Sequence, residues 1–426
     1  MSNVRCAPRG LAALGLCLLL SANAAAFDSG SDGSDGALTF APGAGTIIFD
    51  PVALGLDTDG DNVYHFTTID IPTGTTVRLS SIQLGEGRPV VWLATGNVTV
   101  EGTVDLDGEA GHDYTAGTPL PSTPGAGGFA GGRGETDMTA AQRGNGPGGG
   151  SANGTGAGGG GGNRTVGGTF VGTPAGSPGG SAYGNRFLLP LIGGSGGGGG
   201  SQNGTQNGAG GGAGGGAILI ASSTSIVING TVSARGGSGG AFNNAANGQR
   251  AGGGAGGAIR LVADSVTGTG SAVVSRGTGS ANLSTNAGSH GWVRVEANDA
   301  SFFDTATVTA GSGEYGHPGV VFLPANAPQV RVTTIDSVSV PAQTTGSFVN
   351  PDVTLNVSTQ VAVNLEANNV PVGTTVNLTL RSEDGTTVTV TSTPLAGTLA
   401  TSTATAGPVT FPHGFTRISV YVSFTP

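Results

Sequence analysis

VVWLATGNVTVEGTVDLDGEAG (residues 90–111) is the stretch that decides the fold, because its plan recurs three more times. The copies are AILIASSTSIVINGTVSARGGSG (217–239), AIRLVADSVTGTGSAVVSRGTGS (258–280) and WVRVEANDASFFDTATVTAGSGE (292–314). Each has an apolar strand, a small polar corner, a second alternating strand and then glycine. A unit of this size cannot bury its apolar face alone. The repeats are therefore expected to stack into a parallel β-helix, a solenoid with one long core.

Strand alternation is clear within the first repeat. Val98, Val100 and Val104 point to one face, polar residues alternate with them, and Gly102 stands at the corner between two short strands. The second repeat has Asn229 and Gly230 at the same corner, and both residues tolerate a positive φ. No segment beyond residue 26 has a 3.6-residue apolar period, so the sequence predicts an all-β protein with almost no helix.

Residues 1–26 are typical of a secretory signal peptide. Arg5 and Arg9 give a positive start, residues 11–20 form an apolar run too short to span a membrane, and small residues follow for cleavage. Both cysteines lie in this segment, so the remaining chain has no thiol. No later stretch is long and apolar enough to be a transmembrane span. We expect a secreted or cell-surface protein.

The charge balance limits the partners. All 16 basic residues are arginine, and the net charge of −10 disfavours nucleic acid as a ligand, because phosphate neutralisation needs a basic surface. The absence of lysine also excludes a P-loop in the glycine tracts.

Composition divides the chain into further segments. Residues 27–36 (FDSGSDGSDG) are predicted to be a flexible acidic Gly/Ser linker, with calcium capture by Asp28, Asp32 and Asp35 as the alternative. The predicted β-helix covers residues 37–327, and its glycine-rich insert lies at about 108–216. This insert is either disordered or built of layered, extended polyproline-II segments that bond to one another. Recurrence of glycine at the same phase of each repeat favours the layered form.

Residues 328–426 have little glycine and predict a small antiparallel β-sandwich. The expected strands are 330–334, 337–340, 353–357, 361–367, 375–382, 386–391 and 417–424. Alternation of Ile418, Val420 and Val422 with polar residues indicates one buried and one wet face. This segment resembles an immunoglobulin-like or fibronectin-like module, which implies the architecture only.

Signals for chemistry are few. Asp57, Asp59 and Asp61 alternate as in the opening of a calcium loop, so they are the candidate Ca²⁺ ligands, with an acidic turn as the alternative. Glycine at the fourth position and the absence of a closing glutamate exclude an EF-hand.

Asp105, Asp107 and Glu109 form an outward row. Next-but-one residues on a strand lie about 6–7 Å apart. This spacing overlaps the lower end of the separation between the two catalytic carboxyl groups in inverting glycosidases. This row is the candidate catalytic set, and a solvated outer face is the alternative.

Trp92 and Trp292 fall on the same strand of the first and last repeats. They are candidate sugar-stacking platforms, and core packing is the other interpretation.

Three stretches carry a family resemblance: RPVVWLATGNVTVEGTVDLDG (88–108), LLPLIGGSGGGGG (188–200) and GGAGGAIRLVADSVTGTG (253–270). Over residues 37–327 the chain resembles exported bacterial glycine-rich proteins of the right-handed parallel β-helix type. The resemblance implies that fold and an exported location, and it transfers no catalytic residue.

Two functions follow as hypotheses. The first is an exported structural or adhesive surface protein, a rigid solenoid for display or for binding a cell-surface or extracellular polysaccharide or protein. The second is a polysaccharide-acting β-helix enzyme, a lyase or glycoside hydrolase, that uses Asp105, Asp107 and Glu109. The missing catalytic constellations favour the first.

Overall fold

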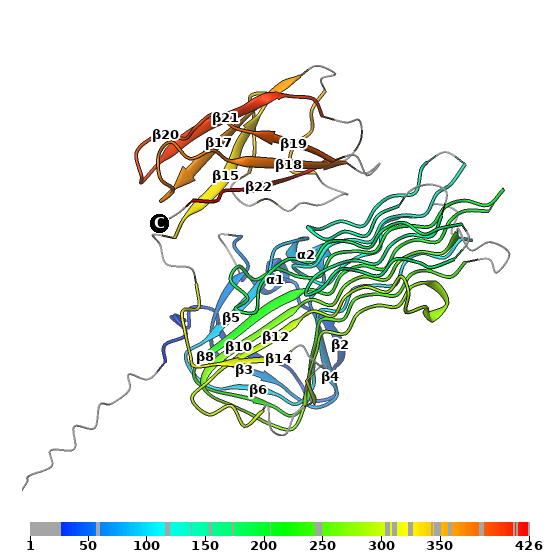
Figure 1. Cartoon of the computed structure of the whole chain (residues 1–426). Coiled ribbons are helices and arrows are strands. Elements are labelled where there is room, and N and C mark those ends of the chain that lie inside the picture. The colour runs from blue at the N-terminus through cyan, green and yellow to red at the C-terminus, as the bar shows by residue number, and fades with distance from the viewer. Residues whose placement is uncertain are drawn as a thin grey trace, which may run out of the picture.

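The computed structural model describes residues 27–56, 60–115, 120–137, 139–152, 156–172, 174–204, 206–242, 249–302, 307–308, 313–322, 327–341, 344, 351–356, 360–382, 387–411, 414 and 416–424. The predicted signal peptide lies outside them. The chain is nearly all β, with 35% strand and 4% helix, as the lack of a helical period predicted (Figure 1). Its described helical turns are α1 (Pro51–Leu54), α2 (Ser81–Leu84) and a 3₁₀ turn, η2 (Ser280–Asn282).

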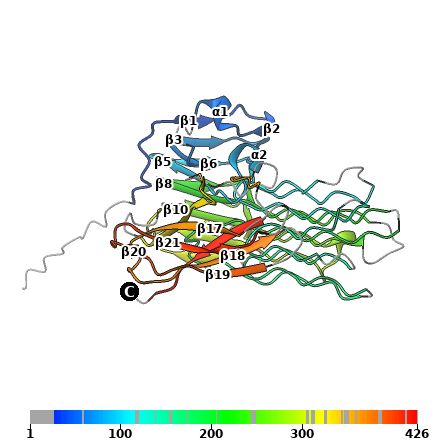
Figure 2. The ribbon, with the colours of Figure 1, turned by 90° about the horizontal axis from the view of Figure 1, so that it is seen from above.

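Two parallel sheets contain the repeats. The first has the order β1 (Gly36–Thr39), β3 (Val63–Ile71), β5 (Val90–Ala94), β8 (Ala217–Ile228), β10 (Ala258–Thr267), β12 (Trp292–Glu296) and β14 (Gly313–Gly316). A short strand, β6 (Val98–Val100), pairs with β3 and β8 in the same sheet. Figure 2 shows β1, β3, β5, β8 and β10 following one another in this order. The four repeats thus supply adjacent, parallel strands.

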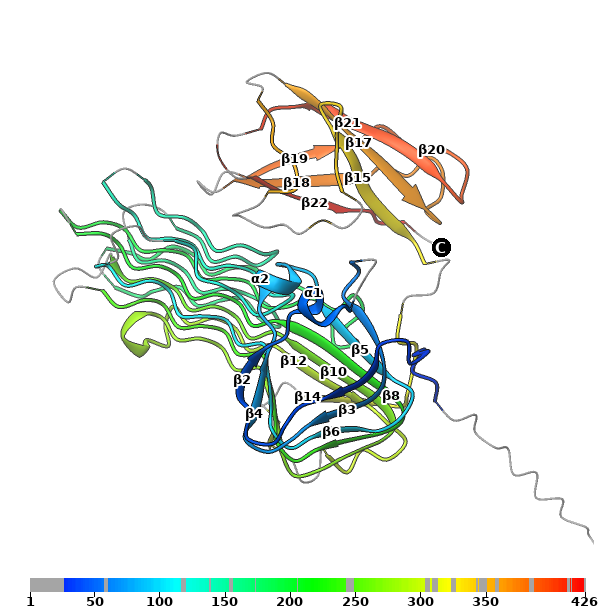
Figure 3. The same ribbon diagram turned by 180° about the vertical axis from the view of Figure 1, so that it is seen from behind.

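The second parallel sheet has the order β2 (Gly45–Ile48), β4 (Thr75–Arg78), β7 (Thr103–Asp105), β9 (Thr231–Ser233), β11 (Ser271–Val273) and β13 (Thr307–Val308). The chain visits the two sheets in turn, and β2 and β4 form a wall separate from that of β5 and β8 (Figure 3). Gly102 stands at the corner between β6 and β7, where a Cβ would lie 2.2 Å from the Thr75 carbonyl oxygen. The corner therefore requires glycine.

One hydrophobic cluster receives side chains from both parallel sheets. Val77, Val104, Val232 and Ala272 come from the second sheet and pack with residues such as Ile220 of the first, all of them fully buried. The alternation predicted for Val98, Val100 and Val104 is confirmed, because all three are buried while Thr99 and Thr103 are only partly buried.

The glycine-rich segments after β7, β9 and β11 run side by side as extended chains (Figure 1). Their backbone hydrogen bonds repeat every three residues, whereas those of a strand ladder would repeat every two. The N–H groups of Gly194, Gly197 and Gly200 donate to the carbonyls of Gly215, Gly212 and Ala209, at 2.8, 2.9 and 2.9 Å. A period of three is that of polyproline II, whose three-residue turn points successive residues at different neighbours. Of the two sequence-based alternatives, the described part of the insert has the ordered, layered one.

Close approach explains why these segments are glycine. A Cβ on Gly212 would lie 1.9 Å from the Gly237 carbonyl oxygen, and one on Gly214 would lie 1.8 Å from that of Gly194. Side chains cannot occupy such positions, so at these glycines backbone packs directly on backbone.

Two antiparallel sheets form the C-terminal part. One has the order β16 (Val338–Ser339), β15 (Gln329–Ile335), β17 (Val361–Asn368), β21 (Ser402–Val409) and β20 (Ala396–Gly397). The other has the order β19 (Thr387–Thr391), β18 (Asn377–Ser382) and β22 (Thr416–Tyr421). Both contribute to a second core cluster, with Val363 and Leu378 fully buried.

One predicted strand in this part was wrong, and β20 and β21 were not predicted. Residues 353–356 are described and are not a strand, although Val353 and Leu355 pack against the second core. The sequence analysis also missed β21, whose Ala, Gly and Pro have low strand propensity. Pairing with β17 and burial of Ala404 and Ala406 decide its conformation instead.

Candidate functional site

The outer face of the second parallel sheet carries a column of hydroxyl side chains. Strand register aligns Thr46, Thr76, Thr103, Thr231 and Ser271 on five successive strands. Thr46 is exposed and the other four are half-buried, while the residues that follow Thr76, Thr103 and Thr231 point into the core. Neighbouring strands lie about 4.8 Å apart, so the hydroxyls repeat at that spacing. The sequence analysis did not identify this column, because β2 and β4 precede the recognisable repeats.

Asp105 lies in the next outward column of the same sheet. Register places it opposite Arg78 of β4, and Nη1 of Arg78 donates to Oδ1 of Asp105 at 2.8 Å. The same Oδ1 accepts the Asp107 backbone N–H at 2.8 Å. The carboxylate therefore joins two strands and fixes the chain where it leaves β7.

Asp107 makes a second set of contacts, to the following repeat. Its Oδ1 accepts from the Ser233 hydroxyl and from the Arg235 backbone N–H, and Nη1 of Arg235 lies 3.1 Å from Oδ2. Glu109 is exposed and lies beyond β7, in the first extended segment, where its N–H donates to the Thr123 carbonyl at 2.9 Å.

These contacts limit what the acidic row can do. The structure brings Asp105 and Asp107 together, and each carboxylate is bound by an arginine and a backbone N–H. Both carboxylates are thus already engaged with groups of the protein itself. The row acts as a ladder of charge pairs between strands. Aligning the repeats could have found Arg235, because it occupies the position that Asp107 has in the first repeat.

The two tryptophans lie in different environments. Trp92 is fully buried beside Phe49 and Phe66, at ring-centroid distances of 5.6 and 6.3 Å, which leaves no ring face open to a sugar. Trp292 is half-buried, pairs in register with Ala258, and has the Arg164 guanidinium 5.3 Å from its ring centroid. The two tryptophans lie on corresponding strands of the first and last repeats, as predicted, but the position on β12 that corresponds to Trp92 is held by Val295, three residues after Trp292.

The candidate calcium ligands fall partly outside the described residues. Asp57 and Asp59 are not described, and Oδ1 of Asp61 accepts the Val63 backbone N–H at 2.8 Å. Within the described ranges, no three His, Cys, Asp or Glu side chains are grouped so as to hold a metal ion.

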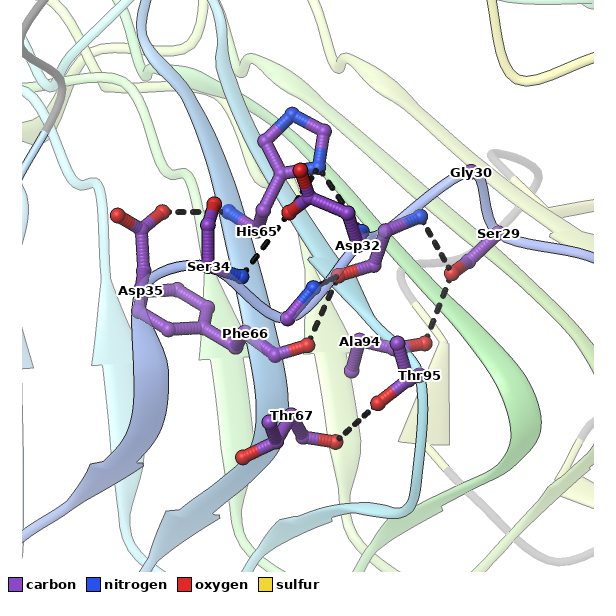
Figure 4. Close-up of polar contacts among 12 residues, drawn as sticks. Ser29, Gly30, Asp32, Ser34, Asp35, His65, Phe66, Thr67, Ala94 and Thr95 are labelled. Carbon is purple, nitrogen blue, oxygen red and sulfur yellow. Dashed lines mark hydrogen bonds and ion pairs between the residues drawn. The ribbon is translucent and has the colours of Figure 1, made fainter.

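The segment 27–36 lies against the first parallel sheet, contrary to the predicted flexible linker (Figure 4). The Ser29 hydroxyl donates to the Ala94 carbonyl and the Ser31 hydroxyl to that of Phe66, each at 2.8 Å. Asp35 accepts the His65 backbone N–H at 2.6 Å. Short polar side chains thus satisfy backbone groups of β3 and β5, a role that composition alone does not reveal.

The pKa of Asp32 in this segment lies below its ordinary value. The main cause is the hydrogen bond that its Oδ1 accepts from the Ser34 backbone N–H at 2.9 Å, and His65, with Nδ1 3.6 Å away, adds to it. Asp32 is fully exposed, so this arrangement is a turn at the surface of the sheet.

A search for relatives adds no further constraint. No protein-family model, no curated protein and no solved structure matches this chain. None of the helices in the described residues has the length and apolar character needed to cross a bilayer. What the chain does must therefore be argued from its own geometry.

Proposed function

We propose that this chain is an exported structural or adhesive protein of the cell surface, a rigid β-solenoid scaffold for display or binding. The fold component of the proposal is a right-handed parallel β-helix. It is supported by the alternation of the chain between two parallel sheets and by the strong preference of parallel crossovers for the right hand.

The observation that carries the function is the outer face of the second parallel sheet. Thr46, Thr76, Thr103, Thr231 and Ser271 present hydroxyls in one register, beside the Arg78–Asp105 ion pair. A repeating array on a rigid sheet suits an extended, repetitive partner such as a polysaccharide, because bound groups meet the same contact at each strand.

Adhesion can be tested with a purified chain of residues 27–426 and immobilised whole cells. The double variant Thr103→Lys/Thr231→Lys places two long cations in the middle of the hydroxyl column. We expect at least a fivefold loss of retained protein. The matched control is Thr389→Lys/Thr403→Lys, which changes two exposed threonines of β19 and β21. Equal retention of the two variants would remove the sheet face from the proposal.

Export has its own test. Cells that produce the full chain should release it or expose it to added protease, whereas a version without residues 2–26 should stay inside. Protease protection of the full chain in intact cells would contradict the proposed location.

The enzyme hypothesis predicts a different result. Turnover of a polysaccharide by the wild-type chain, abolished in Asp105→Asn/Asp107→Asn, would replace the scaffold proposal with catalysis at that ladder. We expect no turnover by either protein, because both carboxylates are already bound to arginine and backbone groups.

A further inference from the structure

Arginine and aromatic side chains gather where the last extended glycine-rich segment enters β12. We call them the arginine–aromatic cluster. Its members are Arg164, Arg186, Phe187, Arg276, Trp292 and Arg294.

The strand geometry of β12 fixes one side of the cluster. Trp292 and Arg294 are half-buried and alternate with the fully buried Val293 and Val295, so they point outward together. Next-but-one side chains on a strand lie about 6–7 Å apart. Trp292 also packs against the buried cluster of Leu188, Ala217 and Ala258, and Leu188 follows Phe187 in the chain. The two aromatic rings therefore belong to one continuous surface.

Guanidinium groups lie against both rings. Arg164 lies 5.3 Å from the Trp292 centroid, and Arg186 and Arg294 lie 5.1 and 5.2 Å from that of Phe187. Phe187 is 50% exposed, and Arg186 is exposed as well. Each of the two rings thus makes at least one cation–π contact.

The cluster is locally basic in a chain of net charge −10. Arg276 is exposed, and its segment runs beside the start of β12, because the Gly291 N–H donates to the Val274 carbonyl at 2.9 Å. The charges of Arg276 and Arg164 add to burial in lowering the pKa of His290. Two carboxylates belong to the same region. Glu296 is bound by both Arg260 and Arg294, and Glu314 pairs in register with Arg294. Together with Arg260, five arginines therefore face two glutamates.

We propose that the arginine–aromatic cluster binds an acidic polysaccharide, a chain of sugar rings that carry carboxylates. Guanidinium groups bind carboxylates through paired hydrogen bonds, and the exposed half of Phe187 offers apolar surface to a sugar ring. A polysaccharide with one carboxylate on each sugar would carry negative charges to pair with the arginines that exceed the glutamates in this region. A nucleic acid is disfavoured as the ligand, because its closely spaced phosphates would be repelled by the acidic residues in the rest of the chain. This inference rests on the proposed scaffold function and names a ligand class for it.

The test uses residues 27–426 and polygalacturonate, with dissociation constants from calorimetry at low and at physiological salt. The double variant Arg186→Gln/Arg276→Gln removes two exposed charges from the cluster. We expect about a tenfold loss of affinity, since each exposed charge contributes a factor of about two to five. The matched control is Arg235→Gln/Arg331→Gln, at positions where the side chains are 46% and 49% exposed. It should change affinity less than about twofold, and thermal melts establish that both variants fold.

Each other outcome overturns a stated part of the proposal. No binding by the wild-type chain at low salt, or equal losses in the two double variants, removes the site. Equal affinity for dextran removes the requirement for charge. Equal affinity for polyglutamate makes the site a general anion site, and a preference for single-stranded DNA makes it a nucleic-acid site. Whole-cell retention that survives while polygalacturonate binding is absent would sink this inference and leave the scaffold function standing.

Discussion

At the scale of single residues, position relative to the strand register decides the role of each tryptophan. Trp92 points into the core between the two parallel sheets, whereas Trp292 begins its strand three residues earlier in register and points outward. An odd shift reverses the face, because side chains alternate along a strand.

Truncation of Trp92 should be strongly destabilising. Trp92→Ala removes the largest fully buried side chain from contact with Phe49 and Phe66. We expect the free energy of unfolding to fall by about 3–5 kcal/mol in denaturant titrations. Phe187→Ala, at a half-exposed ring, should cost less than about 1 kcal/mol. Similar costs for the two variants would contradict the burial of Trp92.

His290 should make stability sensitive to acid. Burial, with Arg276 and Arg164, holds its pKa below the ordinary 6.5, so below that pH the unfolded chain binds more protons than the folded one. The contribution of His290 to the free energy of unfolding is complete above pH 6.5. It is lost as the pH falls through the lowered pKa of the folded state. We expect His290→Gln to show a smaller fall in Tm between about pH 7.5 and 5.5 than the wild type or His112→Gln, an exposed control. Parallel pH profiles would rule this out.

A chelator tests the calcium prediction at Asp57, Asp59 and Asp61. If they hold Ca²⁺, removal of the ion should lower the Tm, since an ion that binds only the folded state stabilises it. The variant Asp57→Asn/Asp59→Asn should then have the same Tm with or without calcium, equal to the Tm of the wild type in the presence of the chelator. An unchanged wild-type melt would eliminate the site.

At the scale of elements, the extended glycine-rich segments depend on backbone contact. Gly212→Ala would place a methyl group 1.9 Å from the Gly237 carbonyl oxygen, so neighbouring segments must separate. We expect a loss of about 1–3 kcal/mol in the free energy of unfolding, as in other overpacked interiors.

The control for Gly212→Ala lies at the tip of the same array. Gly204 has a φ of +61° and open space around it, and asparagine tolerates that conformation. Gly204→Asn adds more atoms than Gly212→Ala and should nevertheless leave stability nearly unchanged. If both variants were neutral, the array would not be closely packed.

At the scale of the whole molecule, the described residues form two separate principal cores. One collects residues 38–302 and the other residues 335–409. We expect calorimetry to resolve two transitions, because cooperative units that share few contacts unfold independently. Ile220→Ala should lower only one transition and Val363→Ala only the other, each by roughly 2–4 kcal/mol. A single transition moved by both variants would show that the cores are coupled.

The sequence by itself determined the strand content and the stacking of the four repeats. These follow from local periodicity, which a single chain carries in its residue order. Tertiary structure alone decided the docking of Ser29 and Ser31 and the formation of β21. Such contacts depend on the register between distant strands, and a shift of one residue changes every partner on the outer face.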